Sequence, residues 1–325
     1  MTFGFSRRPP ARCHFLPRLV AGSLLWAALL CSLIQGAGAA PPPGETAVPL
    51  GRLVAVGQHR LHLYCSGTGT PTVVLEAGLG GNHLDWIRAQ PELSKTTQVC
   101  SYDRAGYGWS EPGPKPRTVE RISGELQLLL RNAGIGGPII LVGHSFGGML
   151  SLYYTAHNAD QVIGLVLIDS MHPDQYERFH DVGVEVPVEP ARGIIHATPE
   201  VLTFGIPEAY RALAHQLARR ESTRSSMFNE LRNIRESMAQ VKAAPPTAVV
   251  RAEVILHGRR EWDRLYGDGR MEDLWIRLQA DLARQIGATR LVVASRSGHQ
   301  VALEDPALVE KIVAGVIRDL RAASD

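Results

Sequence analysis

The chain lacks the sequence features that point to a bound cofactor or to nucleic acid. Its histidines and cysteines show no metal-ligand spacing, and neither a Walker-type phosphate loop nor a dinucleotide-binding glycine fingerprint follows a first strand. We therefore expect no metal and no cofactor. Charge of neither sign dominates, since 34 lysines and arginines face 32 acidic residues, and nothing suggests a nucleic-acid partner.

Acidic residues are absent before Glu45, and this absence sets the N-terminal segment apart. Four arginines come first, an apolar run over residues 19–34 follows, and the small residues Ala37-Gly38-Ala39-Ala40 come last. This order is typical of a secretory signal peptide, which we predict for residues 1–40. The protein is then exported, to the periplasm or the medium, with 30 basic against 32 acidic residues. The alternative is a membrane anchor retained through residues 19–34.

Cysteine is scarce, and two of the four cysteines lie in the N-terminal segment. The other two, Cys65 and Cys100, each lie in a strand-like stretch. In an exported protein such a pair can form one disulfide, whereas two buried free thiols also fit the residues. The residues alone leave both alternatives open.

Beyond a proline-rich linker at residues 41–50, strand-like and helix-like segments alternate without any repeat. Helical patterns include one that Thr118 caps and Gly134 ends, one over 271–286, and one that Asp305-Pro306 opens. The alternation predicts an α/β fold with an eight-stranded, mostly parallel sheet wrapped by helices. The expected strands are 51–56, 60–65, 71–76, 97–102, 138–142, 162–168, 254–257 and 289–294.

Residues 173–248 interrupt this alternation and divide the predicted core into 51–172 and 249–325. They contain two or three helical patterns, including 207–219 and 227–241. An excursion of this length at the active-site end of a sheet is usually a lid or cap. We predict a helical cap that covers the site.

The segment Gly143-His144-Ser145-Phe146-Gly147 lies between an apolar strand-like run and a helix-like stretch. A serine at the tip of a strand-to-helix turn needs small residues on both sides, because the backbone there is crowded. The pattern predicts a nucleophile elbow with Ser145 as the nucleophile.

A serine nucleophile needs a base within hydrogen-bond reach and an acid that orients this base. His299 is the best candidate for the base, because it follows the last strand and precedes the last helix. The mature chain's His62, His83 and His144 are interpreted as structural. Two acids are candidates, Asp169 at the end of one strand and Glu261 after the next, and the sequence does not decide between them; we prefer Asp169.

The oxyanion of a tetrahedral intermediate needs N–H donors, which backbone amides at sharp turns supply. One donor is expected to be the amide of Phe146, directly after the nucleophile. The other is expected in the glycine-rich loop Glu76–Gly81, where we choose Leu79.

Several segments carry a family resemblance: Leu75–Gly78, Tyr102–Ser110, Gly143–Gly148, Val166–Ser170 and Ser297–His299. Together they resemble the α/β-hydrolase superfamily over residues 51–316, most of the cap excluded. The Asp-Arg-x-Gly-x-Gly-x-Ser run is similar to that of capped esterases, haloperoxidase-like and epoxide-hydrolase-like members. Epoxide hydrolases and dehalogenases use an aspartate nucleophile, so Ser145 favours acyl chemistry. The family's strand order would set Cys65 beside Cys100, which favours the disulfide.

These observations predict a serine hydrolase that cleaves a carboxylic ester or related acyl bond of a small-molecule substrate. Ser145, His299 and Asp169 would form the triad, with the amides of Leu79 and Phe146 as the oxyanion hole. The alternatives are a peptidase or a carbon–carbon bond hydrolase with the same triad, or a non-catalytic ligand-binding protein of this fold. The sequence leaves the oligomeric state open.

Overall fold

The computed structural model describes residues 50–184, 199–244, 251–263 and 268–323. Eight strands form one sheet in the order β1-β2-β4-β3-β5-β6-β7-β8. β2 pairs antiparallel with β1 and β4, and the remaining neighbours pair in parallel. This confirms the predicted fold class. The strands are β1 (Arg52–Ala55), β2 (Arg60–Ser66), β3 (Thr72–Glu76), β4 (Val99–Tyr102), β5 (Ile139–His144), β6 (Val162–Ile168), β7 (Arg251–His257) and β8 (Arg290–Ala294).

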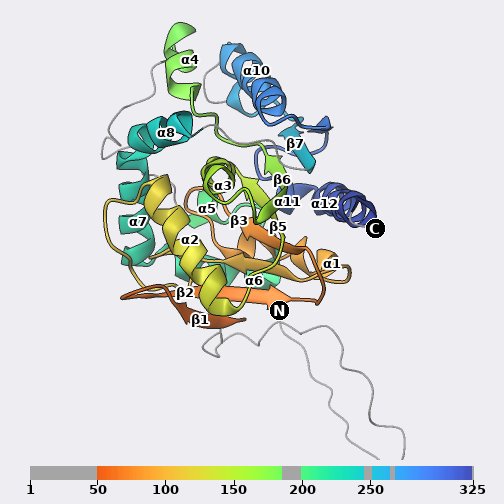
Figure 1. Cartoon of the computed structure of the whole chain (residues 1–325). Coiled ribbons are helices and arrows are strands. Elements are labelled where there is room, and N and C mark those ends of the chain that lie inside the picture. The colour runs from red at the N-terminus through yellow and green to blue at the C-terminus, as the bar shows by residue number, and fades with distance from the viewer. Residues whose placement is uncertain (1–49, 185–198, 245–250, 264–267, 324–325) are drawn as a thin grey trace, which may run out of the picture. The chain divides into compact units, whose positions relative to one another are not determined.

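Helices cover both faces of this sheet (Figure 1). One face packs against α2 (Val119–Ala133) and α3 (Phe146–His157), and the other packs against α1 (Gln90–Leu93) and α12 (Pro306–Ala322). Consecutive strand residues such as Val73 and Val74 enter opposite cores, because side chains alternate across a strand. The inner strands are therefore apolar on both faces, which is typical of a parallel sheet. Further elements are η1 (His83–Trp86), α10 (Arg270–Gln285) and α11 (Val301–Glu304).

Local signals in the sequence place several helix ends correctly. The Thr118 side chain accepts a hydrogen bond from the backbone N–H of Arg121 and caps α2, and Gly134 ends this helix in the left-handed conformation. The helix α12 begins with Pro306 as expected. Asp305 precedes it without a capping hydrogen bond, because its carboxylate instead pairs with Arg296.

In the described parts of the chain between β6 and β7, where the sequence predicts a cap, there are five helices. The pattern over 227–241 predicts one helix, and this is wrong, because Asn233 separates α7 from α8. Asn233 leaves the helical conformation, and its side-chain amide donates to the carbonyl of Asn229. The five are α4 (Gln175–Asp181), α5 (Pro199–Leu202), α6 (Glu208–Ala218), α7 (Glu221–Arg232) and α8 (Ile234–Ala243).

The predicted signal peptide, including the apolar run 19–34, and residues 41–49 of the linker lie outside the described residues. Among the helices that are described, none is long and apolar enough to cross a membrane.

A disulfide joins Cys65 and Cys100, so of the two open alternatives the structure contains the bridged form. The two cysteines are direct partners in the antiparallel ladder of β2 and β4. The bridge therefore closes a loop of 35 residues at a place where the sheet already holds the strands together. Its main contribution to stability comes from restricting the unfolded chain.

We expect the double substitution Cys65→Ala/Cys100→Ala to lower the free energy of unfolding by about 3 kcal/mol, since the unfolded chain gains freedom. Urea unfolding measures this change, and a reducing agent should produce a similar loss in the wild-type chain but none in the variant. An unchanged free energy of unfolding would show that the disulfide does not stabilise the protein.

Candidate active site

Ser145 forms the turn between β5 and α3, and its backbone is strained. Its φ of 54° and ψ of −120° lie in a region that residues with a side chain rarely adopt. Three backbone hydrogen bonds hold this conformation: the N–H of Ser145 donates to Ile168, and its carbonyl accepts from Gly148 and Met171. The hydroxyl-bearing side chain is partly exposed, although the strand before it and the helix after it are buried.

The glycines around Ser145 are required by close backbone contacts. A Cβ at Gly143 would lie 2.5 Å from the carbonyl oxygen of Gly147, and one at Gly147 would lie 2.5 Å from that of Ala77. A Cβ at Gly148 would lie 2.6 Å from the Cβ of Ser170. The strand-to-helix turn therefore has room for glycine alone at these positions.

Asp169 follows β6 and is the centre of a buried hydrogen-bond network. Its Oδ2 lies 2.5 Å from Nδ1 of His299 and 2.7 Å from Nδ1 of His257, and its Oδ1 accepts from the indole N–H of Trp275 at 2.9 Å. Burial by itself raises the pKa of Asp169, but the hydrogen bonds from His257 and His299 outweigh it and hold this pKa well below its usual range. Asp169 is therefore a carboxylate that only accepts hydrogen bonds.

Strained backbone marks Ser145 and Asp169 together. Among the described residues, these two are the non-glycine residues with positive φ, 54° and 45°. Such conformations persist only where the surrounding structure enforces them, and they cluster at functional sites.

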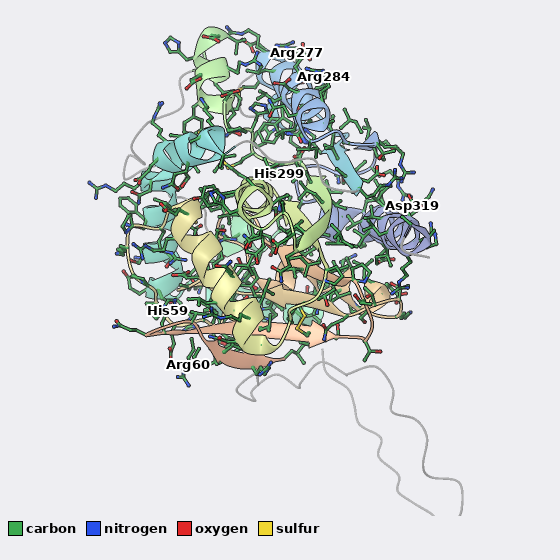
Figure 2. The ribbon with its side chains drawn as sticks, in the orientation of Figure 1. His59, Arg60, Arg277, Arg284, His299 and Asp319 are labelled. Carbon is green, nitrogen blue, oxygen red and sulfur yellow. A yellow bond between two sulfur atoms is a disulfide. The ribbon has the colours of Figure 1, made fainter. Side chains whose placement is uncertain are left out.

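His299 lies in the loop between β8 and α11, near the centre of the folded part in Figure 2. Its backbone N–H donates to Oε2 of Glu261 at 3.0 Å, and its carbonyl oxygen accepts from Nε2 of His144 at 2.8 Å. Its ring is partly exposed and faces Trp262, with 5.4 Å between the ring centroids. Since Nδ1 contacts Asp169, Nε2 is the nitrogen left for a proton transfer.

The two candidate acids contact different parts of His299. The carboxylate of Asp169 lies against the ring, and the carboxylate of Glu261 lies against the backbone amide. Only the first contact can select a tautomer of the imidazole.

His144, interpreted as structural from the sequence, contacts the same loop. Burial and the nearby charge of His299 lower the pKa of His144 to about 3, so its ring is neutral and donates from Nε2 to the carbonyl of His299. It thereby connects the elbow to the loop of the candidate base.

The loop after β3, which contains Leu79, borders Ser145. A Cβ at Gly78 would lie 3.3 Å from the Cβ of Ser145, and Phe146 follows Ser145 as the first residue of α3. The loop that contains Leu79 thus lies beside the serine, and Phe146 follows the serine in the chain. Leu79 is partly buried and Phe146 is fully buried.

Arg104 holds the backbone of this loop. Its guanidinium donates to the carbonyls of Ala77 and Gly78 at 2.6 and 2.8 Å, and it forms buried ion pairs with Glu76 and Glu230. Burial raises the pKa of Glu76 to about 7, although the charge of Arg104 acts in the opposite direction. Because Glu230 belongs to α7, one side chain connects the loop to the inserted helices.

The inserted helices also touch these loops directly. A Cβ at Gly80 would lie 2.6 Å from Leu202 of α5 and 3.2 Å from the sulfur of Met227 of α7. A Cβ at Gly106 would lie 3.0 Å from the carbonyl of Ser222, also in α7. The helices α5 and α7 therefore pack on the loop that borders the serine, and α7 also packs on the loop of Gly106.

Two groups of His and Asp residues bring three ligand-type atoms together among the described residues: Asp169 with His257 and His299, and Asp103 with His62 and His83. In each group the histidine Nδ1 atoms lie 2.5–2.9 Å from the carboxylate. These Nδ1 atoms donate to the carboxylate, so the lone pairs that a metal ion would need between them are not free. Asp103 instead holds together the loops of His83 and Trp109.

Sequence reasoning did not single out His257, Glu272 or Trp275, although all three belong to the Asp169 network. His257 ends β7, and the other two lie one turn apart on α10. The one available signal was a histidine at the end of a strand next to the strand of Asp169.

A family model described as alpha/beta hydrolase fold matches residues 71–238, just over half of the chain. The chain belongs to this family.

Solved structures of the same fold cover most of the chain. An enol-lactonase from Burkholderia xenovorans LB400 is similar at a TM-score of 0.62 and 20% identity, over 81% of this chain and 98% of that one. A thermophilic esterase from Thermogutta terrifontis is similar at a TM-score of 0.62 and 19% identity, over 82% of this chain and 98% of that one.

Curated relatives match over shorter segments. The chain is 33% identical over 144 residues to "Probable transporter efuK" of Hormonema carpetanum, which is 42% of this chain and 21% of that protein. It is 32% identical over 112 residues to the protein YqjL of Bacillus subtilis (strain 168), which is 34% of this chain and 42% of that protein. The chain thus spans less than half the length of these relatives.

We expect Gly147→Ala to lower the free energy of unfolding by about 1–3 kcal/mol, because its Cβ must displace the backbone after β3. Gly124→Ala is the matched control: Gly124 lies exposed within α2 with open space around it, so alanine should stabilise by about 0.5–1 kcal/mol. Thermal or urea unfolding measures both. A Gly147→Ala chain as stable as the wild type would refute the close packing of the turn.

Proposed function

We propose that the chain is a serine hydrolase that cleaves a carboxylic ester or related acyl bond of a small molecule. The observation that carries this proposal is the strained, partly exposed Ser145 beside a histidine loop whose ring is held by the buried Asp169. The fold family is compatible with it, and two of the similar structures are named as an esterase and an enol-lactonase.

In the proposed reaction, Ser145 Oγ attacks the substrate carbonyl while Nε2 of His299 takes the hydroxyl proton. The negative charge on the carbonyl oxygen is stabilised by the backbone N–H groups of Phe146 and Leu79. His299 then donates the proton to the leaving group, the carbon–oxygen bond breaks, and an acyl-enzyme remains. Water, deprotonated by His299, releases the acid and restores Ser145.

Asp169 has two functions in this proposal. It keeps the proton of the neutral imidazole on Nδ1, so that Nε2 can accept, and it stabilises the imidazolium that forms during the attack. Its buried, ionised state suits both tasks, because it cannot itself take up the proton at neutral pH.

We further propose that residues 173–248 act as a cap that chooses the substrate. The contacts of α5 and α7 with Gly80 support this, since these helices pack on the loop beside the serine.

The first test is hydrolysis of p-nitrophenyl esters with short to long acyl chains by the purified chain. Ser145→Ala should lower kcat at least about 1,000-fold, because the nucleophile is lost. Ser94→Ala is the control, because Ser94 lies at the end of α1 and far from Ser145 in the sequence, and it should keep wild-type activity. Full activity of Ser145→Ala would refute the serine mechanism. The acyl chain length of the ester with the highest kcat/KM would indicate the size of the acyl pocket.

The second test separates the two candidate acids. Asp169→Asn should lower kcat about 10⁴-fold, because an amide at this position no longer enforces the reactive tautomer. Glu261→Gln keeps an acceptor for the backbone N–H of His299 and should cost about fivefold or less, the scale of one hydrogen bond. A larger loss in Glu261→Gln than in Asp169→Asn would reverse the assignment.

A further inference from the structure

The carboxylate of Asp169 holds a second histidine, for which the proposed reaction has no use. His257 is fully buried at the end of β7, with Nδ1 2.7 Å from Oδ2 of Asp169. Its backbone N–H also points to Oδ1 of Asp169 at 3.3 Å. His257 and His299 thus share one carboxylate oxygen.

The opposite side of the His257 ring faces another carboxylate. Nε2 lies 2.9 Å from Oε1 of the buried Glu272 on α10, and Oε2 of Glu272 accepts from the backbone N–H of Trp262 at 3.2 Å. Carboxylate oxygens only accept hydrogen bonds, and a neutral imidazole can donate from only one of its nitrogens. Both hydrogen bonds form at once only when the ring carries two protons.

The charges around His257 favour the doubly protonated ring. Asp169 and Glu272 contact it from two sides, its ring also faces the uncharged Trp262, and the uncharged Trp275 donates to Asp169. His299 contacts the same oxygen of Asp169, and the neutral His144 donates to the backbone carbonyl of His299. Burial by itself lowers the pKa of His257, but the hydrogen bond and charge of Asp169 and the charge of Glu272 outweigh it and raise this pKa.

We propose that His257 is a positioning residue, held as an imidazolium between Asp169 and Glu272. It orients Asp169 and partly neutralises the negative charge with which Asp169 acts on His299. This inference rests on the proposed function, because it assigns His299 as the base. His257 touches neither serine nor substrate and transfers no proton in the cycle.

The consequence for catalysis is electrostatic. A fixed positive charge behind Asp169 opposes the arrival of a second positive charge on His299. This charge therefore weakens the attraction of Asp169 for a second proton on the His299 ring, so that Nε2 stays free to accept the proton of Ser145. The acidic limb of the kcat/KM profile reports this state.

Glu272→Gln tests the idea with little change in shape. The amide can accept from Trp262 and donate to Nε2 of His257, so the ring loses one proton but keeps its hydrogen bonds. We expect the midpoint of the acidic limb to move up by about one pH unit, the scale of one nearby charge.

Glu253→Gln is the matched control. Glu253 is also buried on β7, but it pairs with Arg251 and Arg290 at the other end of the strand. Its loss should lower stability and leave the midpoint unchanged. A midpoint that moves equally in both variants, or in neither, overturns the proposal.

Nitrogen-15 NMR of the histidine-labelled wild-type chain gives a readout that needs no turnover. We expect the assigned resonances of His257 to show both ring protons at pH values above the ordinary titration of a histidine, and to show one in Glu272→Gln. A neutral His257 in the wild-type spectrum overturns the proposal even if Glu272→Gln fails to fold. Full activity of Ser145→Ala would instead refute the proposed function, and the NMR result would then stand by itself.

Discussion

The buried carboxylate of Asp169 is the contact on which the rest of the site depends. A charge without solvent is costly unless hydrogen bonds replace the lost water, and Asp169 obtains them from His299, His257 and Trp275. These donors come from a loop, a strand and a helix that are far apart in the sequence. The C-terminal half of the sheet and α10 must therefore be in place before the carboxylate is satisfied, and the ring of His299 takes its position as part of the same requirement.

A second buried charge organises the other side of Ser145. Arg104 binds two carbonyls of the loop after β3 and pairs with Glu76 from the core and Glu230 from α7. The same reasoning applies, since an unpaired guanidinium at this depth would destabilise the fold. The geometry of the loop is thus coupled to the packing of the inserted helices, although Arg104 contacts neither Ser145 nor His299 in the described hydrogen bonds.

Most of the fold and part of the site could be predicted from the sequence. The strands, the capped helix after Thr118 and the glycine pattern around Ser145 depend on residues close together in the chain, and their signals are local. The break at Asn233 was missed, because helical periodicity continues across it and only the conformation of Asn233, whose side chain donates to the carbonyl of Asn229, separates the two helices. The sequence could not decide which of the two candidate acids orients His299, since the two residues follow neighbouring strands and both carboxylates lie near His299.

The amino-acid sequence alone determined the order of strands and helices, the turn that carries Ser145 and the position of His299 after the last strand, because each follows from neighbouring residues. Only the tertiary structure decided which carboxylate meets the ring of His299, that Cys65 pairs with Cys100, and that His257 shares Asp169. These contacts join residues 130, 35 and 88 positions apart. Hydrogen bonds and disulfides act over a few ångströms, so strand register and helix packing choose the partners.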